Sequence, residues 1–125
     1  MKINSEYGKI ILRISLSLVF LWFGINQIYS PLEWVGFIPN FLSQIISAKT
    51  LIILNGSFEI IFGLMMLTGL YLRIVSLFLS LHLISIALSL GYSALLVRDL
   101  GLAFAVLATL FLGPDKWCLD KKNEN

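Results

Sequence analysis

Charged residues and cysteines are scarce in this chain, and each scarcity excludes a class of protein. Only 13% of the 125 residues are charged, whereas 58% are hydrophobic. Soluble domains carry roughly 25% charged residues, so the polar surface is too small for a water-soluble protein of this length. The chain is therefore predicted to be an integral membrane protein. Its single cysteine, Cys118, excludes an internal disulfide and a cysteine metal cluster.

The sequence motifs of many soluble enzymes are also missing. There is no glycine-rich phosphate loop and no Ser/His/Asp or Cys/His arrangement. The single histidine, His82, cannot provide bis-histidine haem ligation within one chain, and no metal site is predicted. The net charge is only +2, and no basic patch with interleaved aromatic residues indicates nucleic-acid binding.

Four apolar runs are each long enough to cross a bilayer, because a helix of about 20 residues rises about 30 Å. They cover residues 10–28, 51–70, 74–90 and 95–112. All three prolines fall outside these runs, which supports the boundaries. We therefore predict one all-α domain over residues 1–125, a transmembrane four-helix bundle with a polar tail over residues 115–125.

The connection between the first two spans is the longest and has an amphipathic pattern. Apolar residues recur at helical spacing within 34–46, and interleaved serine and glutamine residues form a polar side. Asn40 is placed to cap a short helix. We predict an interfacial helix over residues 40–48 that packs over the bundle as a lid, with a binding role as the alternative.

Four spans place both termini on one side of the membrane, and the basic residues indicate which side. Lys49 and Arg98 fall on the side away from the termini. Seven basic residues fall on the side of the termini: Lys2, Lys9, Arg13, Arg73, Lys116, Lys121 and Lys122. The positive-inside rule then predicts a multi-pass protein of the cell membrane with both termini in the cytoplasm.

Glu59 is the one ionisable residue in the second span, and it falls near the middle of that run. An intramembrane carboxylate costs about 2.5–3.5 kcal/mol on insertion scales, so it is expected to have a partner or to be protonated. Asn55, Gly56, Glu59 and Gly63 share one helix face, because residues three, four and seven apart stack. The two glycines are expected to let another backbone come close, with Asn55 and Glu59 hydrogen-bonding across the contact.

Six polar residues lie in the outer half of the predicted bilayer. Glu59 and His82 are each eight residues below the outer ends of their spans, about 12 Å at 1.5 Å per residue. The full set is Asn26, Gln27, Glu59, His82, Arg98 and Asp99. Intramembrane ionisable residues are costly, so these residues form a candidate functional site, with a purely structural role between helices as the alternative.

Partners for the charged residues follow from helix geometry. Arg98 and Asp99 are neighbours and point about 100° apart, so each is expected to pair with a different element. We predict that Arg98 pairs with Glu59. The residues expected beside Asp99 are Asn26, Gln27 or His82.

Structural roles are expected for Asn26, Asn55 and Arg13. Asn26 and Asn55 are expected to hydrogen-bond between helices. Arg13 stands apart from the other intramembrane charges, near the inner face. Its long side chain is expected to extend to the inner headgroups.

Taken in order, several short motifs in this chain resemble the DoxX family of four-span membrane proteins. They are Arg13, Leu21-Trp22-Phe23-Gly24-Ile25-Asn26, the connection through Pro39, Gly56-Ser57-Phe58-Glu59, Gly63-Leu64, Arg73 and Val97-Arg98-Asp99-Leu100-Gly101-Leu102. The resemblance covers about Lys9 to Pro114 and implies a four-helix bundle. Some members are similar to membrane subunits of an archaeal thiosulfate:quinone oxidoreductase, and others are linked to oxidative-stress assemblies. Gln27 stands where relatives often carry a basic residue.

The first functional hypothesis is a membrane subunit of a quinone-linked redox or oxidative-stress system, with the polar cluster at the quinone head group. The candidate catalytic residues are Glu59, His82, Arg98 and Asp99. The candidate cofactor-binding residues are Asn26, Asn55, Glu59, His82 and Arg98. The sequence leaves open whether the chain is itself an enzyme.

Two other classes of function are alternatives to the quinone hypothesis. One is a non-catalytic interaction subunit, whose polar residues orient the helices and dock a partner. The other is a small proton-coupled transporter, although four spans without an inverted repeat disfavour it for a monomer. The expected partners are the lipid bilayer and another membrane or redox subunit or a second copy of the chain.

Overall fold

The computed structural model describes residues 4–89 and 93–120, and within them the regular structure is helical, without strands. The long helices are α1 (Ser5–Tyr29), α3 (Ala48–Thr68), α4 (Leu72–Ser89) and α5 (Ala94–Leu112). All four are long and apolar enough to cross a membrane. The predicted all-α four-helix bundle is confirmed. Residues 91–92, between the predicted third and fourth spans, and the basic residues Lys2, Lys121 and Lys122 lie outside the described residues.

Polar caps set where the long helices begin. The Asn4 side chain accepts a hydrogen bond from the Glu6 amide at 2.9 Å, so α1 starts five residues before the predicted span. Ser47 caps α3 by accepting from the Thr50 amide at 3.2 Å, and Ser93 caps α5 in the same way. These three helices therefore begin before the apolar runs that identified them, whereas α3 ends at Thr68, two residues short of its predicted span.

The predicted interfacial helix over residues 40–48 is wrong in extent. The connection contains a 3₁₀ helix, η1 (Pro31–Phe37), and a single turn, α2 (Asn40–Ser43). Ala48 already belongs to α3 because Ser47 caps that helix. Asn40 is the first residue of α2 and not its cap, which is Pro39 and makes no side-chain cap bond.

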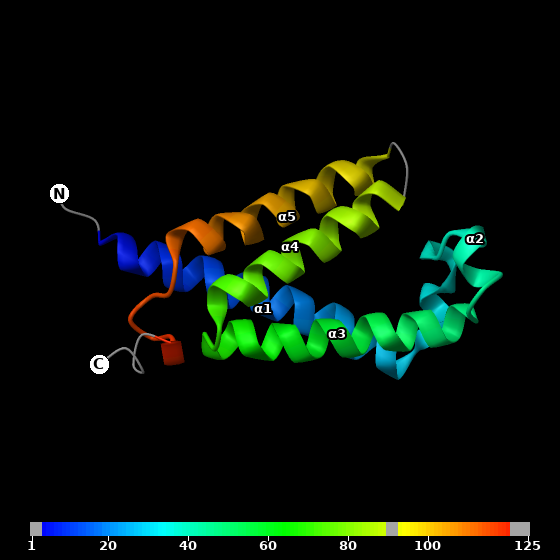
Figure 1. Ribbon diagram of the computed structural model, residues 1–125, viewed down its shortest axis with the longest axis horizontal. Coiled ribbons are helices and arrows are strands. Elements are labelled where there is room, and N and C mark those ends of the chain that lie inside the picture. Colours follow the sequence, from blue (N-terminus) through cyan, green and yellow to red (C-terminus); the bar gives the residue numbers. More distant parts are fainter. Residues whose placement is uncertain (1–3, 90–92, 121–125) are drawn as a thin grey trace.

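The four long helices pack as two pairs. Most interhelical contacts are made between α1 and α3 and between α4 and α5. Figure 1 shows the two pairs diverging toward the end that carries α2, while both termini lie at the opposite end. The main buried cluster occupies the half near the termini and consists of Leu16, Phe20, Met66, Leu72, Val75, Leu79, Val106 and Cys118. The bundle is thus tightly packed at one end and open at the other.

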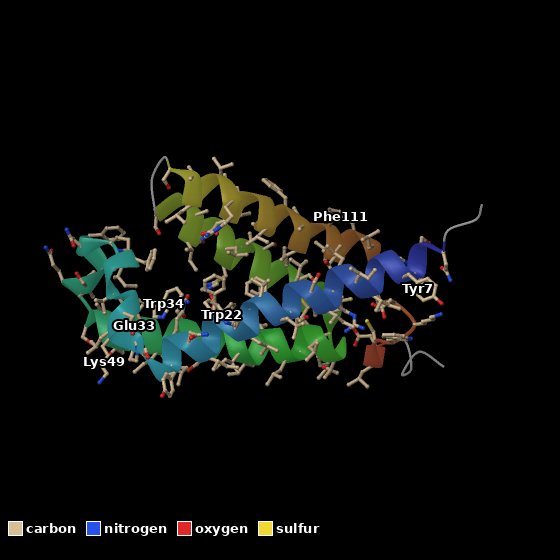
Figure 2. The ribbon with its side chains drawn as sticks, turned by 180° about the vertical axis from the view of Figure 1, so that it is seen from behind. Tyr7, Trp22, Glu33, Trp34, Lys49 and Phe111 are labelled. Atoms are coloured by element: carbon tan, nitrogen blue, oxygen red, sulfur yellow. The ribbon has the colours of Figure 1, made fainter. Side chains whose placement is uncertain are left out.

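The outer surface of the helices is apolar, as a lipid environment requires. Large hydrophobic side chains are exposed on every long helix, including Leu18, Leu54, Ile61, Leu64, Phe78, Leu81, Phe104 and Phe111. In Figure 2, the labelled Phe111 projects outward from the bundle. A soluble protein seldom exposes a continuous apolar surface of this kind, so these side chains are expected to face lipid.

A C-terminal clamp, residues 113–120, holds the packed end together and corrects the prediction for Arg13. Arg13 is buried, and its Nε donates to Asp115 Oδ2 at 2.7 Å, while Nη2 donates to Oδ1 at 3.2 Å. Its Nη1 donates to the carbonyl oxygens of Met66 and Leu67 at the end of α3. Arg13 therefore ties α1 to α3 and to the clamp, and it does not extend to the headgroups.

The rest of the clamp closes the turn between α3 and α4. The two carboxylate oxygens of Asp120 accept from the backbone amides of Tyr71 and Leu72 at 2.8 and 2.7 Å, which caps the start of α4. Cys118 is fully buried and lies against Gly69, whose φ of 75° and lack of a side chain allow the contact. The tail predicted only as polar is thus an ordered part of the fold as far as Asp120.

The Arg13–Asp115 pair predicts loss of stability in acid. Burial alone would raise the pKa of Asp115, but hydrogen bonds from Arg13 and the Trp117 amide, with the charge of Arg13, lower it below its ordinary value. Because the folded-state pKa of Asp115 is lowered, its ionised carboxylate stabilises the fold at pH values above the ordinary aspartate pKa. This stabilisation is lost as the pH falls through the folded-state pKa. Unfolding measured from pH 7 to pH 3 should show a smaller acid-dependent loss in Asp115→Asn than in the unchanged protein. Equal losses in the two proteins would contradict this assignment.

Candidate functional site

A cavity of about 580 Å³ lies where the two helix pairs diverge. Every helical element contributes to its lining, including η1 and α2. Its polar residues are Gln27, Asn55, Glu59, His82, Ser85, Ser89, Arg98 and Asp99. The remaining lining is mostly aliphatic and aromatic, which is the usual character of a small-molecule site.

A close backbone contact between α1 and α3 positions the polar face of α3. A Cβ atom on Gly56 would lie 2.9 Å from the Gly24 carbonyl oxygen, and one on Gly24 would lie 2.8 Å from the Gly56 carbonyl oxygen. The predicted approach at Gly56 is therefore confirmed, and Gly24 is its partner. At Gly63 the neighbours are the side chains of Leu21 and Phe20 rather than backbone.

Asn55 links the two helices at the cavity, as predicted. Its Nδ2 donates to Gln27 Oε1 at 2.7 Å and to Glu59 Oε1 at 3.2 Å. Gln27, whose expected partner was Asp99, instead accepts from Asn55. The Glu59 carboxylate is thereby oriented from one side by an amide that is itself fixed by α1.

Glu59 and His82 meet across the cavity. His82 Nε2 lies 3.6 Å from Glu59 Oε1, slightly beyond hydrogen-bonding distance. Within the described residues, both Glu59 Oε2 and His82 Nε2 are buried without a hydrogen-bond partner. Phe58 stacks on the His82 ring with centroids 4.4 Å apart, which holds the imidazole in place. The contact places both side chains at the same level of the bundle, as predicted, and the unpartnered atoms make the pair the candidate site for a polar ligand.

The predicted Arg98–Glu59 pair is wrong. Arg98 Nε lies 3.3 Å from Asp99 Oδ1, so the two sequence neighbours pair with each other. The Arg98 side chain is 57% exposed, whereas that of Asp99 is 12% exposed. The long guanidinium arm spans the angle between the two positions, which the helix-geometry argument neglected. Both residues still line the cavity.

Asn26 does not take part in the site. Its Nδ2 donates to the Trp22 carbonyl oxygen at 2.7 Å, one turn back in the same helix. It is not among the residues that line the cavity. The prediction that Asn26 bonds another helix is therefore wrong, and its predicted contribution to cofactor binding is not supported by its position outside the lining.

An aromatic wall closes the cavity on the side of η1. Phe23 of α1 contacts Trp34 with ring centroids 5.6 Å apart, and Trp34 contacts Phe37 at 5.7 Å. Figure 2 shows Trp34 at the open end of the bundle. The connection therefore covers the cavity, and its aromatic residues are part of the lining that sequence reasoning did not assign.

Comparison with known proteins identifies the family of this chain. A family model described as DoxX matches residues 8–91. This chain belongs to the DoxX family. The match includes Glu59 and His82, whereas Arg98 and Asp99 of this DoxX protein lie beyond it. Searches of curated proteins and of solved structures found no match.

Metal-binding geometry is not found in the described parts of this DoxX protein. Residues 4–89 and 93–120 contain no group of three or more His, Cys, Asp or Glu side chains that could hold a metal ion. The arrangement that they do contain is a carboxylate and an imidazole in an apolar cavity. Such a pair can hydrogen-bond a polar ligand and hold a proton between two sites.

Proposed function

We propose that this DoxX protein is a membrane subunit of a quinone-linked redox or oxidative-stress system, and that its cavity binds the quinone head group. The observation that carries the proposal is the pair of unpartnered buried atoms, Glu59 Oε2 and His82 Nε2, in a cavity with aromatic and aliphatic walls. A quinone has two carbonyl oxygens on an apolar ring with an apolar tail. Its chemistry matches both the polar and the apolar parts of the lining.

Each polar residue has a defined role in this proposal. His82 donates a hydrogen bond from Nε2 to a quinone oxygen, and Glu59 holds a proton beside it. Asn55 orients the Glu59 carboxyl group through its bond to Oε1. The aromatic wall of Phe23, Trp34 and Phe37 offers an apolar surface to the quinone ring. A bound quinone would supply two-electron, two-proton redox chemistry, with a partner redox subunit as the source of electrons.

The position of the site in the membrane is also part of the proposal. Both termini lie at the end opposite the cavity (Figure 1). Among the described residues, Lys9, Arg73 and Lys116 belong to the terminal end of the helices. We infer from the positive-inside rule that this end faces the cytoplasm and that the cavity lies in the outer half of the cell membrane.

Quinone binding by the full-length protein in lipid nanodiscs tests the proposal. The double variant Glu59→Gln/His82→Ala should raise the Kd for a long-chain quinone by about tenfold or more, because it removes hydrogen bonds worth about 1.5–3 kcal/mol when one partner is charged. Quenching of tryptophan fluorescence provides the measurement, since Trp22 and Trp34 both line the cavity.

A matched control lies on the same helix. Ser57 donates to the Ile53 carbonyl oxygen at 2.8 Å and does not line the cavity, so Ser57→Ala should leave the Kd unchanged. An unchanged Kd in the double variant would refute the site. Absence of quinone binding in the unchanged protein would instead favour an interaction subunit or a transporter.

A further inference from the structure

We propose that the cavity has a lateral portal, formed by Trp22 of α1 and Arg98 of α5, through which its ligand enters from the lipid phase. This inference rests on the proposed function and adds the route and the class of ligand. Trp22 and Arg98 both line the cavity. Each is also strongly exposed, Trp22 at 58% and the Arg98 side chain at 57%. Side chains that are both exposed and in the lining mark the edge of an opening.

The packing of the bundle places this opening between α1 and α5. α1 and α5 pack as loosely as α3 and α4 do, and both seams are far looser than the α1–α3 and α4–α5 pairs, so the two seams are distinguished by what fills them. On the opposite side, between α3 and α4, ring contacts fill the seam: Phe58 with His82 at 4.4 Å and Phe62 with Phe78 at 6.1 Å. Figure 2 shows Trp22 on the side of α1 where the helix pairs separate.

The depth of the portal indicates what passes through it. Trp22 lies seven residues before the end of α1, and Arg98 lies four residues after the start of α5. At 1.5 Å per residue these positions are about 10 Å and about 6 Å inside the helix ends. An opening at that depth faces lipid rather than water. It therefore suits an amphiphile whose tail stays in the membrane while its head enters the cavity.

Arg98 gives the portal its selectivity for the head group. Asp99 accepts a hydrogen bond from Arg98 Nε, which leaves the Nη donors available to another acceptor. A cation this far inside the membrane gains from any oxygen acceptor that reaches it. Carbonyl oxygens of a quinone head fit this role, and the exposed Trp22 ring offers an apolar surface for the tail.

A second opening must be distinguished from the portal. Four other residues of the lining are exposed as well, namely Phe37 and Leu42 in the connection and Ser85 and Ser89 near the end of α4. A small polar ligand can enter between them from the membrane surface. Long-chain and tail-less quinones should therefore use different routes. The association rates of the two quinones, measured separately, therefore distinguish the two openings.

A bulky thiol label at the portal provides the test. In nanodiscs, Trp22→Cys labelled with a large maleimide should bind a long-chain quinone about tenfold more slowly than the unlabelled variant, while a tail-less quinone should bind at an unchanged rate. The native Cys118 is fully buried, and the unchanged chain treated with the same reagent controls for its reaction. Trp34 remains as the fluorescent reporter.

Ile25→Cys is the matched control, because Ile25 is on the same helix, is 57% exposed and does not line the cavity. Its label should not change either rate. Equal rates with labels at positions 22 and 25, or equal slowing of both quinones, would overturn the portal while leaving quinone binding intact.

Arg98→Gln is a second variant, and it should slow the binding of only the long-chain quinone. An unchanged rate would contradict the role of Arg98. Loss of binding in the unlabelled, unchanged protein would overturn the proposed function as well.

Discussion

Asp115→Asn is expected to lower the free energy of unfolding by about 3–5 kcal/mol, because it leaves the buried Arg13 guanidinium without its counter-charge. Arg13 and Asp115 are 2% and 1% exposed, so water cannot replace the lost partner. The substitution also removes one of the two hydrogen bonds from Arg13 to residue 115, because an amide has only one acceptor oxygen. Thermal unfolding in detergent or nanodiscs, followed by circular dichroism, measures the change.

Two further variants distinguish the effect of breaking this buried ion pair from the effect of removing a charge elsewhere. Lys9 pairs with Glu6 at 3.1 Å in a partly exposed position, so Lys9→Met should cost less than about 1 kcal/mol. Arg13→Met combined with Asp115→Leu should recover much of the loss, since an apolar pair leaves no buried charge. A stability of Asp115→Asn within about 1 kcal/mol of the unchanged protein would show that the clamp does not hold the bundle.

Gly56→Leu is expected to destabilise the bundle by about 3 kcal/mol and to weaken ligand binding together with stability. Even the first side-chain atom would lie 2.9 Å from the Gly24 carbonyl oxygen, and backbone cannot move aside as a flexible side chain can. α1 and α3 must then separate, which breaks the 2.7 Å bond from Asn55 to Gln27. Thermal unfolding and quinone titration on the same sample measure both effects.

Gly101→Leu is the matched control for this substitution. Gly101 also lies within a long helix, but a Cβ atom there would have no neighbour within 4 Å. Leucine is a better helix former than glycine by roughly 0.5–1 kcal/mol, so this variant should be as stable as the unchanged protein or slightly more so. Similar losses in the Gly56 and Gly101 variants would show that helix propensity, and not the contact with Gly24, controls the result.

The helices and the polar face of α3 could be predicted from the sequence because their signals are local. Uninterrupted apolar runs identified the spans, and the spacing of Gly56 and Glu59 identified the face that meets α1. The common depth of Glu59 and His82 followed from counting residues along two antiparallel helices. These predictions needed only helix geometry and the cost of a charge in the membrane.

Side-chain partners were harder to predict, because several were available at the same depth. Arg98 reached its own neighbour Asp99, since a long side chain can bend along the helix surface. Asn26 bonded the carbonyl oxygen of the preceding turn, a local option open to any asparagine in a helix. Arg13 found Asp115 in a segment that appeared to be only a polar tail. A signal for this last pair was present, because both residues lie at the terminal end of the bundle and Asp115 directly follows Pro114, after the last span.

The separation of the buried cluster from the cavity has a consequence for how this chain can vary over evolution. Leu16, Met66 and Leu79 stabilise one half of the molecule, while Glu59 and His82 lie in the other. A mutation that reshapes the ligand site therefore leaves the main buried cluster unchanged. Descendants of one ancestral bundle can acquire different ligands without first gaining stability.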